Sequence, residues 1–262
     1  MPRRHKTERL FIKSGGKNIF VQIEYPEGKL PRPAIVVAHG LRSFFPGFLD
    51  IFAKALRKAG YVTVKFHFLG TGKSDGNFED KSTAAMFRNY KDVITYLKTR
   101  EEFRGIGIMA RSNAAALSFV MGPDPDIKAY VMLAPPAFYS KCMRQYTDHA
   151  TEIRDGFFYH KSFKRPHTNG PGRLPLSFVD EIKRFDAPLL RNIPKLRNIA
   201  FFQSEADEAV PIREGHYDYF KRHLHKSGRF FYYKGGNHSF KGFKRVVIAD
   251  AIRWFKEKLP VT

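Results

Sequence analysis

The sequence predicts an α/β fold, a mostly parallel sheet of about eight strands with helices on its faces. Two observations support this prediction. Short apolar or alternating runs, typical of strands, take turns along the chain with longer segments whose apolar residues recur at helical spacing. The chain has 262 residues, of which 43% are hydrophobic, enough for one large domain with a sizeable core.

An opening β-hairpin is predicted, followed by alternating buried strands and helices. Alternating segments at 9–13 and 18–24 flank Ser14-Gly15-Gly16, as in a hairpin. The continuous apolar run 34–38 is typical of a strand buried on both faces. The later strands are predicted at 61–68, 105–110, 129–134, 198–204 and 229–233. Helices are predicted at 48–59, 83–99, 113–121, 212–224 and 243–259.

One stretch, residues 137–186, breaks this rhythm with prolines, glycines, aromatic and basic residues. About fifty residues are too many for an ordinary connection, so the stretch is either a lid subdomain or a misread part of the core. We favour an inserted lid. The predicted division is an α/β core at 1–136 and 187–262, with the lid at 137–186.

The net charge is unusually positive. Lys and Arg number 46 against 25 Asp and Glu, a formal net charge of +21. Such a charge favours anionic partners, whether nucleic acid, membrane surfaces or acidic substrates. The basic residues are spread along the chain without an RNA-recognition signature or zinc-ligand spacing, so a solvated basic surface is the simpler interpretation and nucleic acid is not the expected partner.

No targeting or membrane segment is predicted. No apolar run approaches the ~20 residues that cross a bilayer. The basic start at 1–6 is followed by Thr7-Glu8-Arg9 where a secretory signal would be apolar. Cys142 is the single cysteine and excludes a disulfide within the chain. The expected compartment is the cytoplasm, unless a signal has been trimmed.

Ser112 is the candidate nucleophile. It follows a predicted strand and precedes small residues suited to a close-packed helix, the layout of a nucleophile elbow. The usual pattern is Gly-x-Ser-x-Gly because Cβ atoms crowd the turn, whereas here Ala110 and Ala114 replace the glycines. Alanine keeps the turn possible under greater strain. The alternative is that Ser112 only caps the following helix.

Asp207 and His238 complete a predicted catalytic triad. Each lies in a loop after a different predicted strand, and Ser, Asp and His occur in the chain order typical of α/β hydrolases. Helix capping by Asp207 and an ordinary loop position for His238 are the alternatives. In the triad, His238 takes the serine proton and Asp207 orients the imidazole. The oxyanion donors are predicted to be the backbone N–H groups of Asn113 and Leu41.

The chain resembles the α/β-hydrolase superfamily over nearly its whole length. The resemblance rests on His39-Gly40, on 68–76 (Phe-Leu-Gly-Thr-Gly-Lys-Ser-Asp-Gly), on 133–137 (Leu-Ala-Pro-Pro-Ala) and on the Asp207 and His238 loops. Within it, the chain is most similar to feruloyl (cinnamoyl) esterases through Gly-Lys-Ser-Asp-Gly-Asn-Phe-Glu at 72–79, Ala-Pro at 134–135 and the insertion before the acid loop.

The resemblance implies a lid over the acyl pocket whose aromatic and polar residues hold a phenolic ring. The candidates for such contacts are Tyr139, Phe157, Phe158 and Tyr159. Two departures bear on activity. Arg111 stands where the family usually has histidine before the nucleophile, and His67 stands where aspartate is common. An inactive relative is therefore an open alternative.

Two other motifs do not predict a site. Gly70-Thr71-Gly72-Lys73-Ser74 ends like a phosphate-binding loop, but the full pattern needs glycine at position 67. The histidines lack a partnered carboxylate or cysteine at metal-ligand spacing; those considered are His160, His167, His223 and His225. Neither a cofactor nor a metal is expected.

The predicted function is a serine carboxylic-ester hydrolase acting through an acyl-enzyme on small-molecule hydroxycinnamate (feruloyl), other aryl or short acyl esters, with aromatic polyesters as a side activity. Two alternatives remain: a peptidase or amidase of the same fold, and a catalytically inactive basic protein that binds nucleic acid. Basic residues of the predicted lid are either simply solvated or gather an ester attached to an anionic polymer; they are Lys141, Arg144, Lys161, Lys164 and Arg165.

Overall fold

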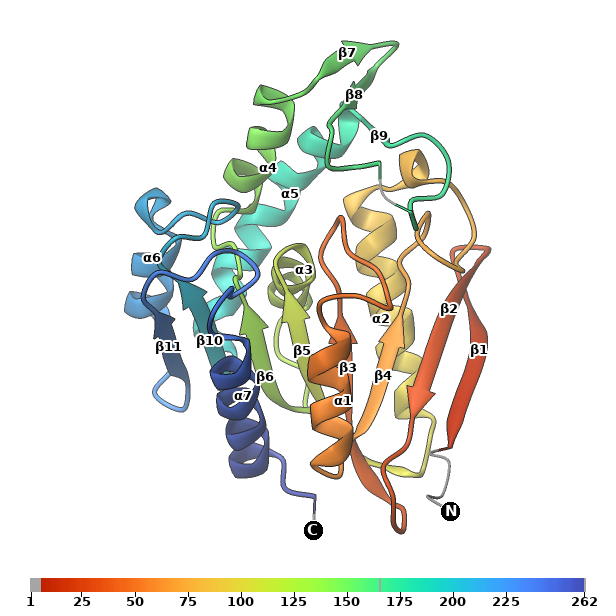
Figure 1. The fold of residues 1–262 in the computed structure, drawn as a ribbon, viewed down its shortest axis with the longest axis vertical. Helices are drawn as coiled ribbons and strands as arrows, with labels where there is room; N and C mark the ends of the chain where they lie inside the picture. The colour runs from red at the N-terminus through yellow and green to blue at the C-terminus, as the bar shows by residue number, and fades with distance from the viewer. Residues whose placement is uncertain (1–5, 165, 262) are drawn as a thin grey trace.

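The computed structural model describes residues 6–164 and 166–261, and its centre is one eight-stranded sheet (Figure 1). The strand order is β1-β2-β4-β3-β5-β6-β10-β11. β1 and β2 form the predicted hairpin and pair antiparallel, as do β2 and β4, while the remaining pairs are parallel. The bounds are β1 Thr7–Ser14, β2 Lys17–Glu24, β3 Arg32–Ala38, β4 Val62–Phe66, β5 Phe103–Arg111, β6 Ile127–Leu133, β10 Ile199–Ser204 and β11 Arg229–Tyr233. The predicted α/β architecture is confirmed.

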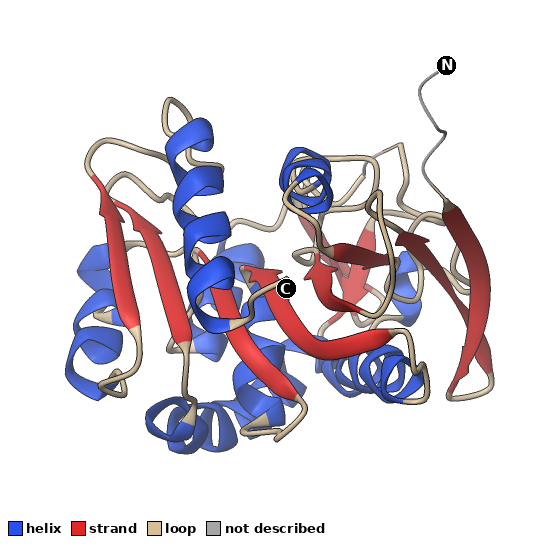
Figure 2. Ribbon diagram, turned by 90° about the horizontal axis from the view of Figure 1, so that it is seen from below, coloured by secondary structure: helices blue, strands red, loops and turns tan. Residues whose placement is uncertain are grey.

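Helices cover both faces of the sheet, as Figure 2 shows from below. α1 (Asp50–Lys58) and α7 (Lys244–Lys258) pack on one face. α2 (Thr83–Lys98), α3 (Asn113–Met121) and α6 (His216–His223) pack on the other. Each face has its own buried apolar cluster, because the strands are apolar on both sides.

The predicted helix at 212–224 is interrupted. A 3₁₀ turn, η3 (Ile212–Glu214), comes first, and Gly215 then takes the left-handed conformation with φ of 83° before α6 begins. Glycine adopts this conformation without the steric cost that a Cβ brings. Two further 3₁₀ turns are η1 (Phe78–Asp80) and η2 (Ile193–Lys195).

The irregular stretch lies beyond the carboxyl ends of the core strands (Figure 1). It contains α4 (Tyr139–Asp148), a small antiparallel sheet and the start of α5 (Ser177–Asn192). The strands of the small sheet are β7 (Glu152–Arg154), β8 (Phe157–Tyr159) and β9 (Arg173–Pro175). The predicted boundary at 186 falls inside α5, which continues and packs against α3 of the core. Arg165 and the basic start at 1–5 lie outside the described residues.

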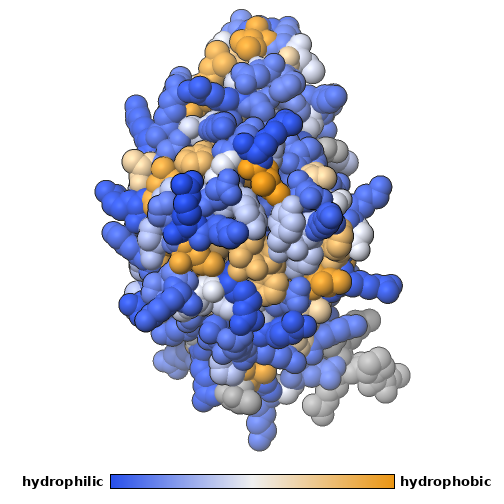
Figure 3. Space-filling view, turned by 90° about the vertical axis from the view of Figure 1, so that its left-hand side faces the viewer, coloured by the Kyte–Doolittle hydropathy of each residue, from blue (hydrophilic) through white to orange (hydrophobic). Residues whose placement is uncertain are grey.

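The surface matches the charged composition. Figure 3 shows hydrophilic side chains over most of one face, with apolar groups in small separate areas. Lys141 and Arg144 on α4, and Lys161 and Lys164 beyond β8, are exposed. Within the described residues, no helix is both long enough and apolar enough to cross a bilayer.

Gly107 provides a test of the packing between β5 and α7. A Cβ at Gly107 would lie 2.5 Å from Ile35 Cδ1 and 2.9 Å from Phe255 Cε1. We expect Gly107→Val to lower the free energy of unfolding by about 1–3 kcal/mol through overpacking, and Gly107→Ala to lower it less. Urea unfolding of the three proteins measures this. Equal stability of all three would contradict the packing.

Candidate active site

Ser112 occupies a sharp turn between β5 and α3. Its φ of 54° and ψ of −121° are unusual for a residue with a Cβ. The turn is held because Ser112 N–H donates to the Leu133 carbonyl at 2.9 Å, while the Ser112 carbonyl accepts from Ala115 at 2.9 Å and Ala116 at 3.1 Å. The Ser112 side chain makes no capping hydrogen bond to α3. Its hydroxyl is therefore not used as a helix cap, which was the alternative left open by the sequence.

Small residues let the surrounding backbone approach this turn. Ala110 and Ala114 are fully buried on either side of it. A Cβ at Gly40 would lie 3.4 Å from both the Arg111 carbonyl oxygen and the Ser112 Cβ. The His39-Gly40 loop therefore passes directly beside the serine.

His238 and Asp207 are bound to each other. His238 Nδ1 lies 2.9 Å from both Asp207 carboxylate oxygens. Asp207 Oδ1 also accepts from the backbone N–H groups of Ala209 at 2.9 Å and Val210 at 2.8 Å. These bonds fix the carboxylate, so Nδ1 carries the imidazole proton and Nε2 is left as the acceptor. The arrangement is that of a base and its orienting acid.

The environment of His238 favours the neutral imidazole. Burial lowers the pKa of His238, the nearby Arg111 cation lowers it further, and the Asp207 carboxylate partly offsets both effects. An imidazole with a lowered pKa is neutral at pH 7 and able to accept a proton. This is the protonation state that a general base needs.

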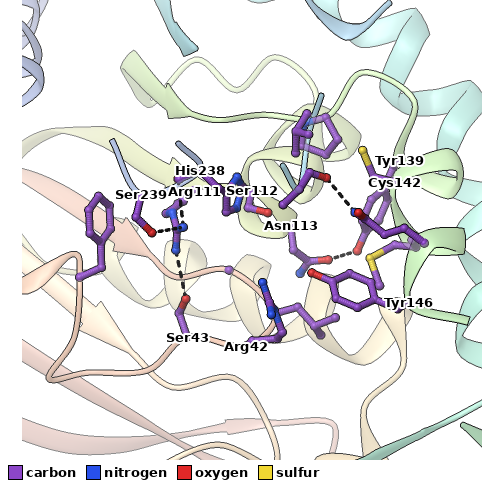
Figure 4. Close-up of a pocket in the computed structure, with 18 of the residues that line it drawn as sticks. Arg42, Ser43, Arg111, Ser112, Asn113, Tyr139, Cys142, Tyr146, His238 and Ser239 are labelled. Atoms are coloured by element: carbon purple, nitrogen blue, oxygen red, sulfur yellow. Dashed lines mark hydrogen bonds between the residues drawn. The ribbon is translucent and has the colours of Figure 1, made fainter. Parts of the chain in front are cut away.

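Ser112 and His238 line the same cavity, of about 310 Å³ (Figure 4). Its other walls come from the loop at 40–48, from α4 and from Ala209 and Val210 after the acid loop. Asp207 lies behind His238 and is buried. The structure thus brings together the three residues that the sequence singled out from three separate loops.

The two predicted oxyanion donors, Leu41 and Asn113, also line this cavity. Within the described residues, neither backbone N–H has a hydrogen-bond acceptor. Asn113 N–H is free because it belongs to the first turn of α3, where no carbonyl precedes it in the helix. The positive end of the α3 dipole adds to its ability to receive negative charge.

Of the four aromatic candidates in the insertion, the cavity includes only Tyr139. Its hydroxyl donates to the Asn113 side-chain oxygen, which ties α4 to the start of α3. Phe157, Phe158 and Tyr159 are absent from the cavity wall because β8 pairs them into the small sheet. Phe158 is fully buried there. Their positions do not support the prediction that these three residues contact the substrate.

Several cavity residues were missed by sequence reasoning. Arg42, Ser43 and Phe48 come from the loop after Gly40, and Gln145 and Tyr146 come from α4. The helical spacing of Tyr139, Met143 and Tyr146 on one side of α4 was the available signal, but it required knowing that residues 139–148 form a helix.

His67 supports the loop rather than the reaction. Its Nδ1 accepts from Lys73 N–H at 3.0 Å, so Nε2 carries the proton and donates to the Phe45 carbonyl at 2.9 Å. Burial lowers the pKa of His67 to about 4 and keeps it neutral. His67 thus fixes the loop that presents Leu41.

A cluster of possible metal ligands also borders the cavity. Cys142 Sγ lies 3.1 Å from His216 Nε2, and Glu214 Oε2 lies 3.4 Å from the same nitrogen. His216 Nδ1, however, accepts from the backbone N–H groups of Ala137 at 3.2 Å and Phe138 at 3.1 Å. The proton must therefore be on Nε2, the nitrogen that a metal would need. The cluster does not fit a metal, and burial raises the pKa of the Cys142 thiol, so it is not a thiolate.

Comparison with solved structures finds the same fold along nearly the whole chain. Est1E from Butyrivibrio proteoclasticus, with ferulic acid bound, matches with a TM-score of 0.75 at 17% identity over 95% of this chain and 99% of that chain. An esterase domain from Rhodothermus marinus gives 0.69 at 18% identity over 95% and 98%. An alpha-beta serine hydrolase homologue from Coxiella burnetii gives 0.64 at 19% identity over 94% and 96%. These likenesses confirm the predicted fold and carry no conclusion about substrate.

Sequence comparisons give less. No protein-family model matches the chain. An uncharacterized 31.7 kDa protein in the traX-finO intergenic region of Escherichia coli is 29% identical over 85 residues. The match covers 32% of this chain and 30% of the relative, so the chain spans less than a third of the length of the curated relative it matches.

The two charges beside His238 predict opposite changes in its pKa. We expect Arg111→Gln to raise the pKa of His238, because a nearby cation is lost. We expect Asp207→Asn to lower it, because a carboxylate that stabilises the imidazolium is lost. NMR titration of the imidazole signals measures both. Shifts in the same direction would contradict the geometry.

Proposed function

We propose that this chain, which has the α/β-hydrolase fold, is a serine carboxylic-ester hydrolase that acts through an acyl-enzyme on Ser112. One observation carries the proposal. A serine on a strained turn, an imidazole bound to a buried carboxylate and two unpaired backbone N–H groups meet at one cavity. These groups are the nucleophile, the base and the oxyanion donors that acyl transfer requires.

The first half of the reaction forms the acyl-enzyme. His238 Nε2 takes the Ser112 hydroxyl proton as Oγ attacks the ester carbonyl carbon, which gives a tetrahedral intermediate. The imidazolium then returns the proton to the alcohol oxygen as the bond between carbon and that oxygen breaks. In the second half, a water molecule attacks the acyl carbon by the same route and releases the acid.

Electrostatic stabilisation falls to the backbone. The oxyanion of the tetrahedral intermediate is placed to accept from the N–H groups of Leu41 and Asn113, whose hydrogen-bonding capacity is unused within the described residues. Because both groups are fixed before substrate arrives, they lose little energy to reorganisation. Loss of one such donor typically costs about 10²–10³ in rate.

Hydroxycinnamate (feruloyl) and other aryl or short acyl esters are the proposed substrates. The support is the sequence resemblance to feruloyl esterases, the fold shared with Est1E and the aromatic and apolar wall of the cavity. That wall includes Tyr139, Met143 and Tyr146 from α4, and Phe44 and Phe48 from the loop at 40–48. We propose that α4 and the small sheet act as the lid over the acyl group, and that Tyr139 and Tyr146 contact its ring.

Ser112→Ala tests the nucleophile. We expect the native protein to hydrolyse 4-nitrophenyl butyrate and methyl ferulate, and the variant to lose several orders of magnitude in kcat, since no other group attacks in its place. Mass spectrometry after a fluorophosphonate probe should show one adduct on native protein and none on the variant.

Cys142→Ala is the matched control, because Cys142 carries the thiol that borders the cavity within the described residues. It should keep the fluorophosphonate adduct and most of the esterase activity. Equal activity of native protein and Ser112→Ala, or loss of activity in Cys142→Ala alone, would overturn the assignment of Ser112.

A further inference from the structure

Arg111 is a buried cation that no carboxylate of the described residues contacts directly. Only 8% of its surface is exposed, and within the described residues no carboxylate lies within ion-pair distance of its guanidinium. Its pKa is lowered to about 10 by burial, so it remains charged at pH 7. The Asp207 carboxylate stabilises the Arg111 cation without contacting it and offsets part of the cost of burial. A carboxylate in direct contact with the guanidinium would stabilise the cation further.

Neutral groups hold the guanidinium in place. Nη2 donates to the His238 carbonyl and to Ser239 Oγ, both at 3.1 Å, and Nη1 donates to Ser43 Oγ at 3.4 Å (Figure 4). The Phe48 ring lies 4.7 Å from the guanidinium carbon. Nε–H is buried and has no acceptor among the residues that the structure describes. The cation is therefore rigid, with hydrogen-bonding capacity to spare.

The two serine hydroxyls around Arg111 are oriented by it. Ser43 Oγ and Ser239 Oγ each accept from the guanidinium, so each has its own proton left to donate elsewhere. Ser43, Ser239 and Arg111 all line the cavity that contains Ser112. One cation and two directed O–H donors on one wall form a receptor for a carboxylate.

The charge of the cavity also favours a carboxylate as ligand. The basic side chains that line the cavity besides His238 are Arg42 and Arg111, and no Asp or Glu lines it within the described residues. The nearest carboxylates are already engaged behind the wall. Asp207 binds His238 Nδ1, and Glu208 accepts from His238 N–H at 3.1 Å.

We propose that this wall binds a carboxylate on the alcohol portion of the ester, so that the preferred substrates carry an acidic leaving group. The side follows from His238. Arg111 donates to the His238 carbonyl, and Ser239 follows His238 in the chain. Because His238 returns the proton to the leaving oxygen, a group bound by Arg111 and Ser239 belongs to the leaving alcohol. The proposal rests on the proposed esterase function and adds a substrate class to it.

Two matched esters test the proposal: 4-(butyryloxy)benzoate and its neutral methyl ester. The ratio of their kcat/KM values is compared between native protein and Arg111→Gln, which cancels their different intrinsic reactivities. We expect the preference for the anionic ester to fall roughly 10- to 100-fold, the value of a hydrogen-bonded charge pair. Ser239→Ala keeps the buried cation and should give a smaller loss in the same direction.

Arg144→Gln is the charge-matched control, since Arg144 is an exposed residue of α4 that does not line the cavity. It should leave the ratio unchanged. If Arg111→Gln lowers both esters equally, Arg111 only positions the His238 loop and the proposal fails. If Arg144→Gln changes the ratio as much as Arg111→Gln, the overall charge is responsible, and the proposal fails in that case too.

Binding separates this proposal from the esterase function. Calorimetry with the stable amide 4-(butyrylamino)benzoate and its methyl ester, on Ser112→Ala protein with and without Arg111→Gln, needs no turnover. Preferential binding of the anionic amide that is lost with Arg111→Gln supports the carboxylate site even if no ester is cleaved. Equal binding of the two amides overturns it even if neutral esters are cleaved.

Discussion

The left-handed turn at Ser112 is the constraint on which the rest of the site depends. It points the serine side chain away from β5 and begins α3 in the next residue, so one backbone conformation exposes the hydroxyl and frees the Asn113 N–H. The cost of a positive φ at a residue with a Cβ is of order 1–3 kcal/mol. Hydrogen bonds to Leu133, Ala115 and Ala116 and the absence of side-chain bulk around the turn offset it.

Buried polar contacts hold the other loops of the site in fixed positions. His67 holds the loop at 40–48 through Phe45 on one side, and Arg111 joins the same loop to the His238 loop through Ser43 and Ser239. Asp207 is held by its own backbone and by His238. The reacting groups thus lie on loops, and contacts with β5 and with one another hold these loops in place.

The sequence was sufficient for the core and for the positions of Ser112, Asp207 and His238, because strand ends are readable from hydrophobic runs and parallel strands share one edge. It was insufficient for the cavity wall. The residues of β8, Phe157 to Tyr159, are all aromatic. Nothing in the local sequence shows that they pair with β7 and β9 instead of contacting the substrate. Tyr146 and Arg42 escaped for the same reason, since their neighbours are distant in sequence. The break at Gly215 was visible as a glycine, but its left-handed conformation was not.

Arg111 links the unusual elbow sequence to the strength of the base. Its cation lowers the pKa of His238, while Asp207 raises it. A carboxylate bound against Arg111 offsets part of that cation's field, so the pKa of the imidazole rises when an acidic substrate is in place. A neutral ester leaves the cation unbalanced and meets a weaker base. On this argument Arg111 discriminates twice, once in binding and again in the proton transfer that follows, and both effects arise from a single buried charge.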